Sequence, residues 1–209
     1  MEVKDRGAVV VLEGNSKVVK DEETIMSDNM IYTKKESAVS ASGNVVMSSK
    51  TKDNELFDVR GNFADYNMKN GSGKLWGNIV LKYFTRDSAK PIVLGSQELY
   101  IDKNQKIFEA YDSVQVVTSD GKVYSDNVIF FQEKRCIVFK KDKKRPIAVI
   151  LREGEKGVYE ADNIFFYNFD KNKKVIMNGS ILARIKIEDK KVEDKDKKTE
   201  DKKTNDAKN

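Results

Sequence analysis

The side chains that most often carry out chemistry are scarce in this sequence. Its 209 residues include no histidine, and Cys136 is the only cysteine. The CxxC and HExxH metal signatures are therefore absent, and so is every nucleophilic triad that needs an imidazole base. An intrachain disulfide is excluded as well, because a bridge needs two cysteines. The sequence predicts a protein that is not an enzyme and that uses no metal or other cofactor.

Carboxylates are the remaining candidates for chemistry. Asp28, Asp126 and Asp162 recur in the tripeptides Ser-Asp-Asn and Ala-Asp-Asn, and Asp65 follows Ala64 in a similar stretch. A metal site or an acid–base pair needs carboxylates that converge, whereas equivalent places in successive units form a row. We therefore expect these side chains to cap strand-entry turns. A hydrolase that works through a carboxylate pair stays open as an alternative.

The charge pattern argues against a nucleic-acid partner. The net charge is +5, but the lysines are spread through turns and interleaved with acidic residues, which is typical of a solvated surface. The run from Lys140 to Arg145 is expected to be an exposed hairpin turn and is the best local candidate for a phosphate contact. Apolar runs such as Ala8–Leu12 are far shorter than the roughly 18 residues of a membrane-spanning helix.

Composition divides the chain into a body and a tail. From Glu188 onward lysines and acidic residues balance, and Val192 and Ala207 are the only aliphatic residues. Such a segment buries too little apolar surface to offset the entropy of ordering. We predict one domain over residues 1–187 and a disordered charged tail over residues 188–209. The N-terminus lacks the apolar stretch of a signal peptide, so the protein is either cytoplasmic or had a signal removed.

The body has the pattern of a β protein. Val, Ile, Tyr and Phe recur at every second residue, with turn formers between the runs, as in "VQVVTSDGKVYSDNVIFF". In that stretch, Asp120-Gly121 predicts a two-residue hairpin turn.

A repeat of about 35 residues runs through the body. Its first marker is a glycine or a residue in the same place, and its second is a small residue followed by a polar pair and an aromatic-rich strand. The first marker falls at Gly7, Gly43, Gly77, Asp112, Pro146 and Gly179, and the second at Ser27, Ala64, Ser96, Ser125 and Ala161. Such self-similarity predicts a stacked or rolled architecture in which each unit covers its neighbour's apolar face.

One face of the predicted strands is almost wholly aliphatic and has glycine at its centre. Side chains two residues apart share a face, and counting from Gly43 and Gly77 selects Val45, Met47 and Ile79. A glycine inside a strand marks a bulge, a bend or a close approach. Strands that bend at their midpoints can wrap two sheet halves around a shared interior. Small residues on this face leave that interior roomy, whereas a corner filled by side chains alone is the other interpretation.

The stretches "SASGNVVM", "ADYNMKNGSGKLWGNIVLKYF" and "YEADNIFFYNFDKNKKVIMNGSILARI" resemble the OstA-like (organic solvent tolerance) domain of lipopolysaccharide transport proteins. The likeness extends over about residues 3 to 187. The sequence departs from the pattern at Asp112 and Pro146, where an anchor glycine is expected, and in its tail.

The resemblance implies an incomplete, elongated antiparallel jelly-roll, folded like a taco, with no catalytic activity. Its aliphatic groove would hold the lipid part of lipopolysaccharide or a similar envelope glycolipid on the way from the inner to the outer membrane. The residues expected to line the groove are Val45, Met47, Ile79, Leu81, Leu99, Ile101, Val114, Val116, Val128, Phe130, Ile164 and Phe166.

The resemblance also implies a location and partners. A periplasmic bridge protein is the expected role, with its signal peptide already removed. Its partners would be other OstA-like transport components, joined by edge-strand pairing, and copies of itself in a head-to-tail oligomer. Two alternatives stay open: a structural or adhesive β-repeat protein with a solid core and no lipid, and the soluble part of a membrane-anchored partner in the same transport system.

Overall fold

The computed structural model describes residues 2–4, 8–51, 53–86, 90–152, 155–168 and 173–187. The predicted tail lies outside the described residues. Within them the chain forms fifteen strands and no helix, which confirms the predicted all-β class. The strands are β1 Glu2–Lys4, β2 Val9–Lys20, β3 Glu23–Thr33, β4 Ala38–Lys50, β5 Leu56–Asn67, β6 Ser72–Phe84, β7 Ile92–Asp102, β8 Ile107–Thr118, β9 Gly121–Phe131, β10 Cys136–Lys140, β11 Ile147–Arg152, β12 Glu155–Glu160, β13 Asn163–Tyr167, β14 Lys174–Asn178 and β15 Leu182–Ile187.

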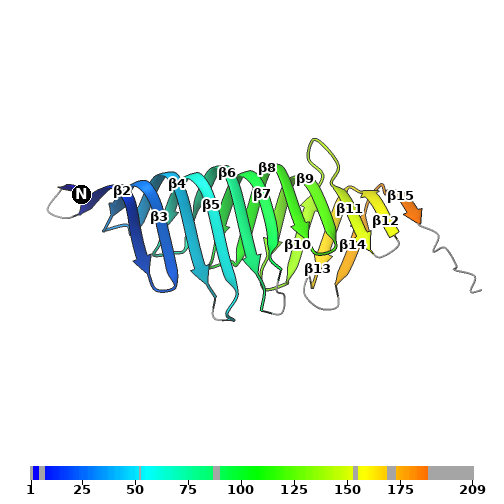
Figure 1. Cartoon of the computed structure of the whole chain (residues 1–209), viewed down its shortest axis with the longest axis horizontal. Coiled ribbons are helices and arrows are strands. Elements are labelled where there is room, and N and C mark those ends of the chain that lie inside the picture. The colour runs from blue at the N-terminus through cyan, green and yellow to red at the C-terminus, as the bar shows by residue number, and fades with distance from the viewer. Residues whose placement is uncertain are drawn as a thin grey trace, which may run out of the picture.

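The strands form one long, open, antiparallel sheet. From β1 to β10 each strand pairs with the next one in the sequence, and β13 and β14 continue that order beyond β10. Strand β11 pairs with β9 and β12, and β12 pairs with β15. Figure 1 shows the elongated body that results, with the N-terminal strands at one end and β14 and β15 at the other.

The long strands β2 to β9 bend near their midpoints because β-bulges interrupt the pairing there. In β4, Gly43 and Asn44 have φ angles of 77° and 48°, in the left-handed region. Ser42 pairs with Phe63 and Val45 pairs with Gly61, so these two residues face only Asn62 on β5. Extra residues of this kind bend a strand sharply. Equivalent left-handed pairs lie at 14–15, 77–78 and 112–113.

These bends form a corner that divides the sheet into two facing halves. Half-sheet I contains residues 9–13 of β2, 29–33 of β3, 38–42 of β4, 63–67 of β5, 72–76 of β6, 98–102 of β7, 107–111 of β8 and 127–131 of β9, with β10, β13 and β14. Half-sheet II contains the other halves of β2 to β9, with β11, β12 and β15. Beyond β9 the strands are interrupted at the corner, so that β10 belongs to one half and β11 to the other.

The core lies between the two half-sheets. Leu75, Leu99 and Ile164 of half-sheet I are fully buried there, and Ile25 and Val116 of half-sheet II are almost fully buried. Burial of one complete face fixes the register, because a slip by one residue would expose all of these side chains.

The structure contains the predicted repeat, but one predicted marker is wrong. Among the described residues the first bend lies at Gly14-Asn15. Gly7, the predicted marker, lies outside the described residues. The tight turn at residues 21–22 shortens the first unit. Counting back from Gly43 by a constant interval of about 35 residues therefore overshoots the bend at Gly14. In β3, Ser27 lies just before Asp28, the single residue that faces the bulge of β2. In β5, Gly61 lies just before Asn62, the single residue that faces the bulge of β4. The second marker in β5 is therefore Gly61 and not Ala64, which lies three positions further on.

Three other local expectations also need correction. Asp28 lies in the middle of β3 and not at a strand entry. It lies opposite a bulge and not beside a turn. Residues 141–146 join β10 to β11 across the corner and do not form a hairpin turn, although Lys141 to Lys144 are exposed as expected. The hairpin between β8 and β9 turns at residues 119–120, and Gly121 already pairs with Thr118.

None of the described residues belongs to a helix that is long and apolar enough to cross a membrane.

Candidate functional site

The residues predicted to line a groove all lie on the inner face of the folded sheet. Phe166 is partly buried and packs against the core, and the other eleven are buried, with exposed fractions of 7% or less. The buried residues are Val45, Met47, Ile79, Leu81, Leu99, Ile101, Val114, Val116, Val128, Phe130 and Ile164. The face assigned from the two-residue period therefore agrees with the structure, whereas lipid contact by these residues stays a prediction.

Strand pairing arranges the inner side chains in continuous apolar rows along the body. The first row follows successive Cα partners across half-sheet I: Leu12, Met30, Ala41, Ala64, Leu75, Leu99, Ala110, Val128, Phe139, Ile164 and Met177. The second row does the same across half-sheet II: Val18, Ile25, Met47, Val59, Leu81, Leu94, Val116, Val123, Ala148, Tyr159 and Ala183. Ten steps of about 4.8 Å make each row about 50 Å long.

The space between the two rows is almost filled by protein. One internal cavity, beside Met47, Phe57 and Ile101, has a volume of about 10 Å³. Another, beside Leu81 and Phe130, has a volume of about 20 Å³. Cavities of this size hold about one water molecule. An acyl chain would enter this interior only if the two half-sheets moved apart.

Aromatic rings account for much of the filling. Phe57 of β5 stacks on Tyr83 of β6, with centroids 4.5 Å apart, and on Phe108 of β8, with centroids 4.6 Å apart. The ring centroid of Phe130 of β9 lies 5.2 Å from that of Tyr83. These rings reach across from one half-sheet to the other, so they are the side chains that would have to move first if the interior opened.

A row of polar contacts closes the side of the body opposite the corner. We call this side the seam; it lies where the hairpin turns of half-sheet I meet those of half-sheet II. Glu55, which is only 3% exposed, accepts a hydrogen bond of 2.5 Å from the Tyr83 hydroxyl and forms an ion pair of 3.0 Å with Arg135. Sequence reasoning missed these residues, because a charge in a turn was interpreted as solvated surface.

Further contacts of this kind lie along the seam. Lys103 forms an ion pair with Glu23 and donates a hydrogen bond of 2.7 Å to the Ser49 hydroxyl. The hydroxyl of Tyr66 lies 3.3 Å from Glu23. Burial, and then the negative charge of Glu23, raise the pKa of Tyr66 far above its usual value. The phenol therefore stays neutral and acts as a hydrogen-bond donor.

The repeated aspartates hold the corner together and do not converge. Asp28 accepts a hydrogen bond of 2.9 Å from the Asn44 side chain, Asp126 one of 2.9 Å from the Lys144 amide and Asp162 one of 3.0 Å from the Ser180 amide. Three or more potential metal ligands gather nowhere among the described residues. The single thiol, Cys136, is buried, and this burial raises its pKa.

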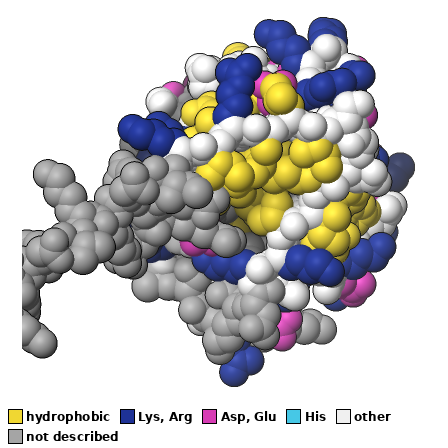
Figure 2. Space-filling view, turned by 90° about the vertical axis from the view of Figure 1, so that its right-hand side faces the viewer, with side chains coloured by type: hydrophobic (Ala, Val, Ile, Leu, Met, Phe, Trp, Pro, Cys, Tyr) yellow, Lys and Arg dark blue, Asp and Glu magenta, His cyan; other side chains and the backbone are white. Residues whose placement is uncertain are grey.

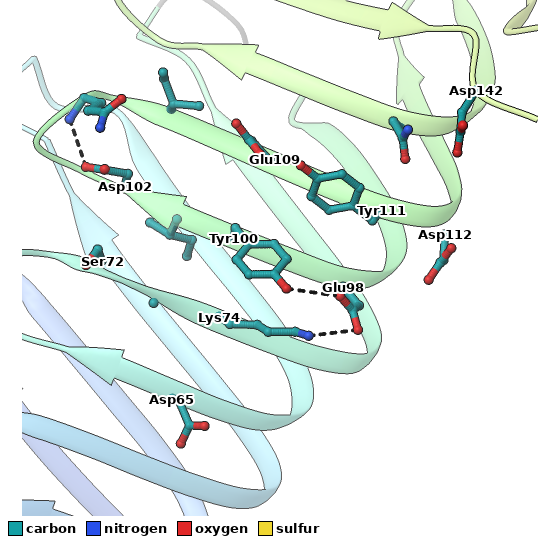
Figure 3. A pocket seen from close by; sticks show the side chains of 15 residues that line it. Asp65, Ser72, Lys74, Glu98, Tyr100, Asp102, Glu109, Tyr111, Asp112 and Asp142 are labelled. Atoms are coloured by element: carbon teal, nitrogen blue, oxygen red, sulfur yellow. Dashed lines mark hydrogen bonds and ion pairs between the residues drawn. The ribbon is translucent and has the colours of Figure 1, made fainter.

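A large hollow lies on the outer face of half-sheet I and not in the interior (Figure 3). It has a volume of about 1030 Å³. Tyr100 and Tyr111 meet edge to face at its centre, and Lys74 forms an ion pair of 2.9 Å with Glu98. The six carboxylates that line it belong to Asp65, Glu98, Asp102, Glu109, Asp112 and Asp142. An open groove with such a lining would not shield a hydrocarbon chain from water.

The C-terminal end of the body exposes apolar side chains and unpaired strand edges. Among the described strands, β14 ends the order of half-sheet I, and β15 pairs with β12 alone. Ile185 has the parity of the inner face, yet it is 54% exposed because no further strand in the described part of the chain covers it. Figure 2 shows hydrophobic side chains gathered at this end, with Lys and Arg around them. Ile181 and Ala183, at the same end of the body, are exposed as well.

Comparison with known proteins identifies the family. A search of the curated proteins finds no match. A family model described as "LptA/(LptD N-terminal domain) LPS transport protein" matches residues 1–105, which is half of the 209-residue chain. This match agrees with the bent, open, antiparallel sheet and with the resemblance found in the sequence. The chain therefore belongs to the LptA/LptD N-terminal domain family of lipopolysaccharide transport proteins.

Proposed function

We propose that this chain is a non-catalytic periplasmic carrier that holds the acyl chains of lipopolysaccharide between its two half-sheets. The observation that carries the proposal is the pair of continuous apolar rows that face each other along the body. Membership of a lipopolysaccharide transport family supports it. The outer groove does not compete for this role, because carboxylates line it.

The physical need for such a shield is large. Each methylene group kept from water contributes roughly 0.8 kcal/mol, so an acyl chain of about twelve carbons that crosses an aqueous space unshielded costs on the order of 10 kcal/mol. The rows offer Leu75, Leu99 and Val116, among others, as replacement contacts for water. Binding in the interior needs no chemical step.

The proposed partners meet the carrier at the ends of the sheet. Strands β14 and β15 are edge strands at one end, and β1 with residues 16–20 of β2 forms the edges at the other. Edge strands have unpaired backbone groups that favour pairing with another chain. We propose that other members of the transport system, or further copies of this chain, add to these edges so that the interiors become continuous.

A photo-crosslinking residue inside the sheet tests the lipid site. Ile79 and Val116 point into the interior, whereas Lys82 lies on the outer face of β6. In cells that make lipopolysaccharide, a photo-reactive residue at position 79 or 116 should form an adduct with it, and one at position 82 should not. Equal labelling at the three positions would reject the assignment of the lipid site to the inner face.

A second candidate function follows from the small internal cavities. With about 10 and 20 Å³ of free space, the interior also has the packing of a structural β-repeat protein with a solid core. The same experiment separates the two functions. The absence of an adduct at both Ile79 and Val116, in a variant that is folded and located in the periplasm, would favour the solid core.

A further inference from the structure

The closed interior raises the question of where a lipid would enter it. On the corner side, the backbones of β2 to β9 run without a break from one half-sheet to the other. Opening there would require the sheet to tear. At the seam, by contrast, the two half-sheets meet through the turns between strands, and the contacts that join them there involve side chains.

Among the described residues, contacts across the seam occur at four places along the body. The Lys20 side chain donates a hydrogen bond of 2.6 Å to the Met68 carbonyl, and Lys103 contacts Glu23 and Ser49. Further along, Arg135 pairs with Glu55, and Lys173 forms an ion pair of 2.8 Å with Asp120. When such a polar contact breaks, water replaces the lost partner, so the net free-energy cost is small. Apolar surfaces that separate gain no such replacement.

The charges of the three ion pairs are sorted by half-sheet. The cations Lys103, Arg135 and Lys173 all belong to turns of half-sheet I, and the carboxylates of Glu23, Glu55 and Asp120 all belong to half-sheet II. Opening the seam would therefore separate a positive rim from a negative rim.

The remaining charges in the turns reinforce this difference. The described turn residues of half-sheet I carry the basic side chains Lys34, Lys35, Lys69, Lys103, Lys106, Lys134, Arg135 and Lys173 and the acidic side chains Glu36 and Glu133. Those of half-sheet II carry the acidic side chains Asp21, Glu22, Asp53, Glu55 and Asp120 and the basic side chains Arg86 and Lys90. The positive rim is thus a property of the whole edge and not only of the paired residues.

We propose that the seam is the entrance for acyl chains and that the basic rim of half-sheet I receives the phosphate-bearing headgroup. The inference rests on the proposed lipid-carrier function. As the half-sheets part, the acyl chains move sideways between the apolar rows. The headgroup stays outside, where Lys103, Arg135 and Lys173 exchange their carboxylate partners for phosphate oxygens. Arginine and lysine form strong charge-assisted hydrogen bonds with phosphate, which compensates for the broken ion pairs.

A reversible lock across the seam tests the entrance. In a Cys136→Ala background, Glu55→Cys and Arg135→Cys are joined by a short bis-methanethiosulfonate crosslinker, which forms a disulfide with each thiol by releasing a sulfinate and is cleaved by a reductant. Uptake of a fluorescent long-chain fatty acid and of purified lipopolysaccharide is then measured before and after cleavage. The locked protein should lose uptake at least about tenfold, and cleavage should restore it. Asp120→Cys with Lys173→Cys provides a second lock if the first variant does not fold.

Three outcomes decide the matter. Loss of uptake only in the locked form supports the entrance at the seam. Equal uptake in locked and cleaved protein overturns the entrance in favour of entry at an end of the sheet, and the carrier function survives. Failure of the wild-type chain to take up either lipid overturns the carrier function and the entrance together.

Two matched triple variants test the headgroup contact. Lys103→Gln with Arg135→Gln and Lys173→Gln removes the cations, whereas Glu23→Gln with Glu55→Gln and Asp120→Asn breaks the same ion pairs but keeps the cations. The first variant should bind phosphorylated lipopolysaccharide about tenfold more weakly and dephosphorylated lipopolysaccharide as the wild type does. The second should retain the affinity for both lipids and take them up faster. Equal affinity of the two variants for phosphorylated lipid would overturn the headgroup assignment.

Discussion

Glu55 and Arg135 are 80 residues apart in the sequence, yet Glu55 Oε1 lies 3.0 Å from Arg135 Nη1. The same separation of 80 residues joins Glu23 to Lys103. Both pairs therefore join half-sheet II to a turn of half-sheet I that lies 80 residues further along the chain. The separation differs elsewhere on the seam: Lys20 and Met68 are 48 residues apart.

The Glu55–Arg135 pair should contribute measurably to stability. We expect Arg135→Met to lower the free energy of unfolding by about 1–3 kcal/mol, measured by urea denaturation. An orphaned buried charge would cost more, but Arg135 is one-third exposed and Tyr83 still donates to Glu55.

The exposed Lys106–Glu133 pair, with a distance of 2.7 Å, provides the matched control. Lys106→Met should leave the urea midpoint unchanged, because solvent screens this pair. If both variants were equally stable, the buried seam pair would have no special role.

The bulge glycines differ in what surrounds them, which gives a second prediction. Gly43 and Gly14 both have left-handed φ angles, of 77° and 72°. A Cβ at Gly43 would lie 2.5 Å from the carboxylate of Asp28, whereas a Cβ at Gly14 would meet nothing within 4 Å. Gly14→Ala should therefore show backbone strain alone, about 1–2 kcal/mol, and Gly43→Ala about 1 kcal/mol more.

The additional effect of Gly43→Ala should come from Asp28. Moving its carboxylate disturbs the hydrogen bond from Asn44. In a background of Asp28→Ala, the two glycine substitutions should lower the urea midpoint by the same amount. A difference that persists in this background would show that the bend itself, and not the Asp28 contact, is sensitive at Gly43.

The sequence predicts the strands and their faces well because the two-residue period is a local property. Val45, Ile79 and Val116 could be assigned to the inner face from their neighbours alone, and all three are buried. The bend could be expected from the recurring glycine, but the bend at Gly14 could not, because a short turn breaks the constant spacing.

The seam, by contrast, could not be predicted from sequence. Whether Glu55 is buried depends on which turn of the other half-sheet lies opposite it, and that depends on how far each bulge bends its strand. The free volume of the interior likewise depends on side chains that are far apart in the sequence. Small residues such as Ala41 and Ala110 indicate room, but rings such as Phe57, which reach in from neighbouring strands, fill it.

Acid should destabilise the corner at Asp162. The amide of Ser180, followed by the charges of Arg145 and Lys141, holds the pKa of this carboxyl below its usual value. A lowered folded pKa contributes stability that is present above the unfolded pKa, near 3.9, and is lost as the pH falls through the folded value. The urea midpoint of the wild type should therefore fall below about pH 4.

The substitution Asp162→Asn separates this effect from general acid denaturation. The amide oxygen still accepts from Ser180, but the group no longer titrates. The variant should be less stable than the wild type at pH 7 and should lose less stability between pH 5 and pH 3. Parallel pH profiles for the two proteins would assign the acid sensitivity to other carboxylates.

The exposed C-terminal edge should make the protein associate end to end. Unpaired edge strands and apolar residues such as Ile185, which is 54% exposed, favour addition of another chain. Light scattering should show a mass that rises with protein concentration.

Ile185→Lys should reduce this association, because a charge at the open end would be buried in the joint. Val80→Lys is the control, since Val80 is 38% exposed in the middle of the sheet. A constant monomer mass for the wild type, or equal association of both variants, would contradict joining through the β15 edge.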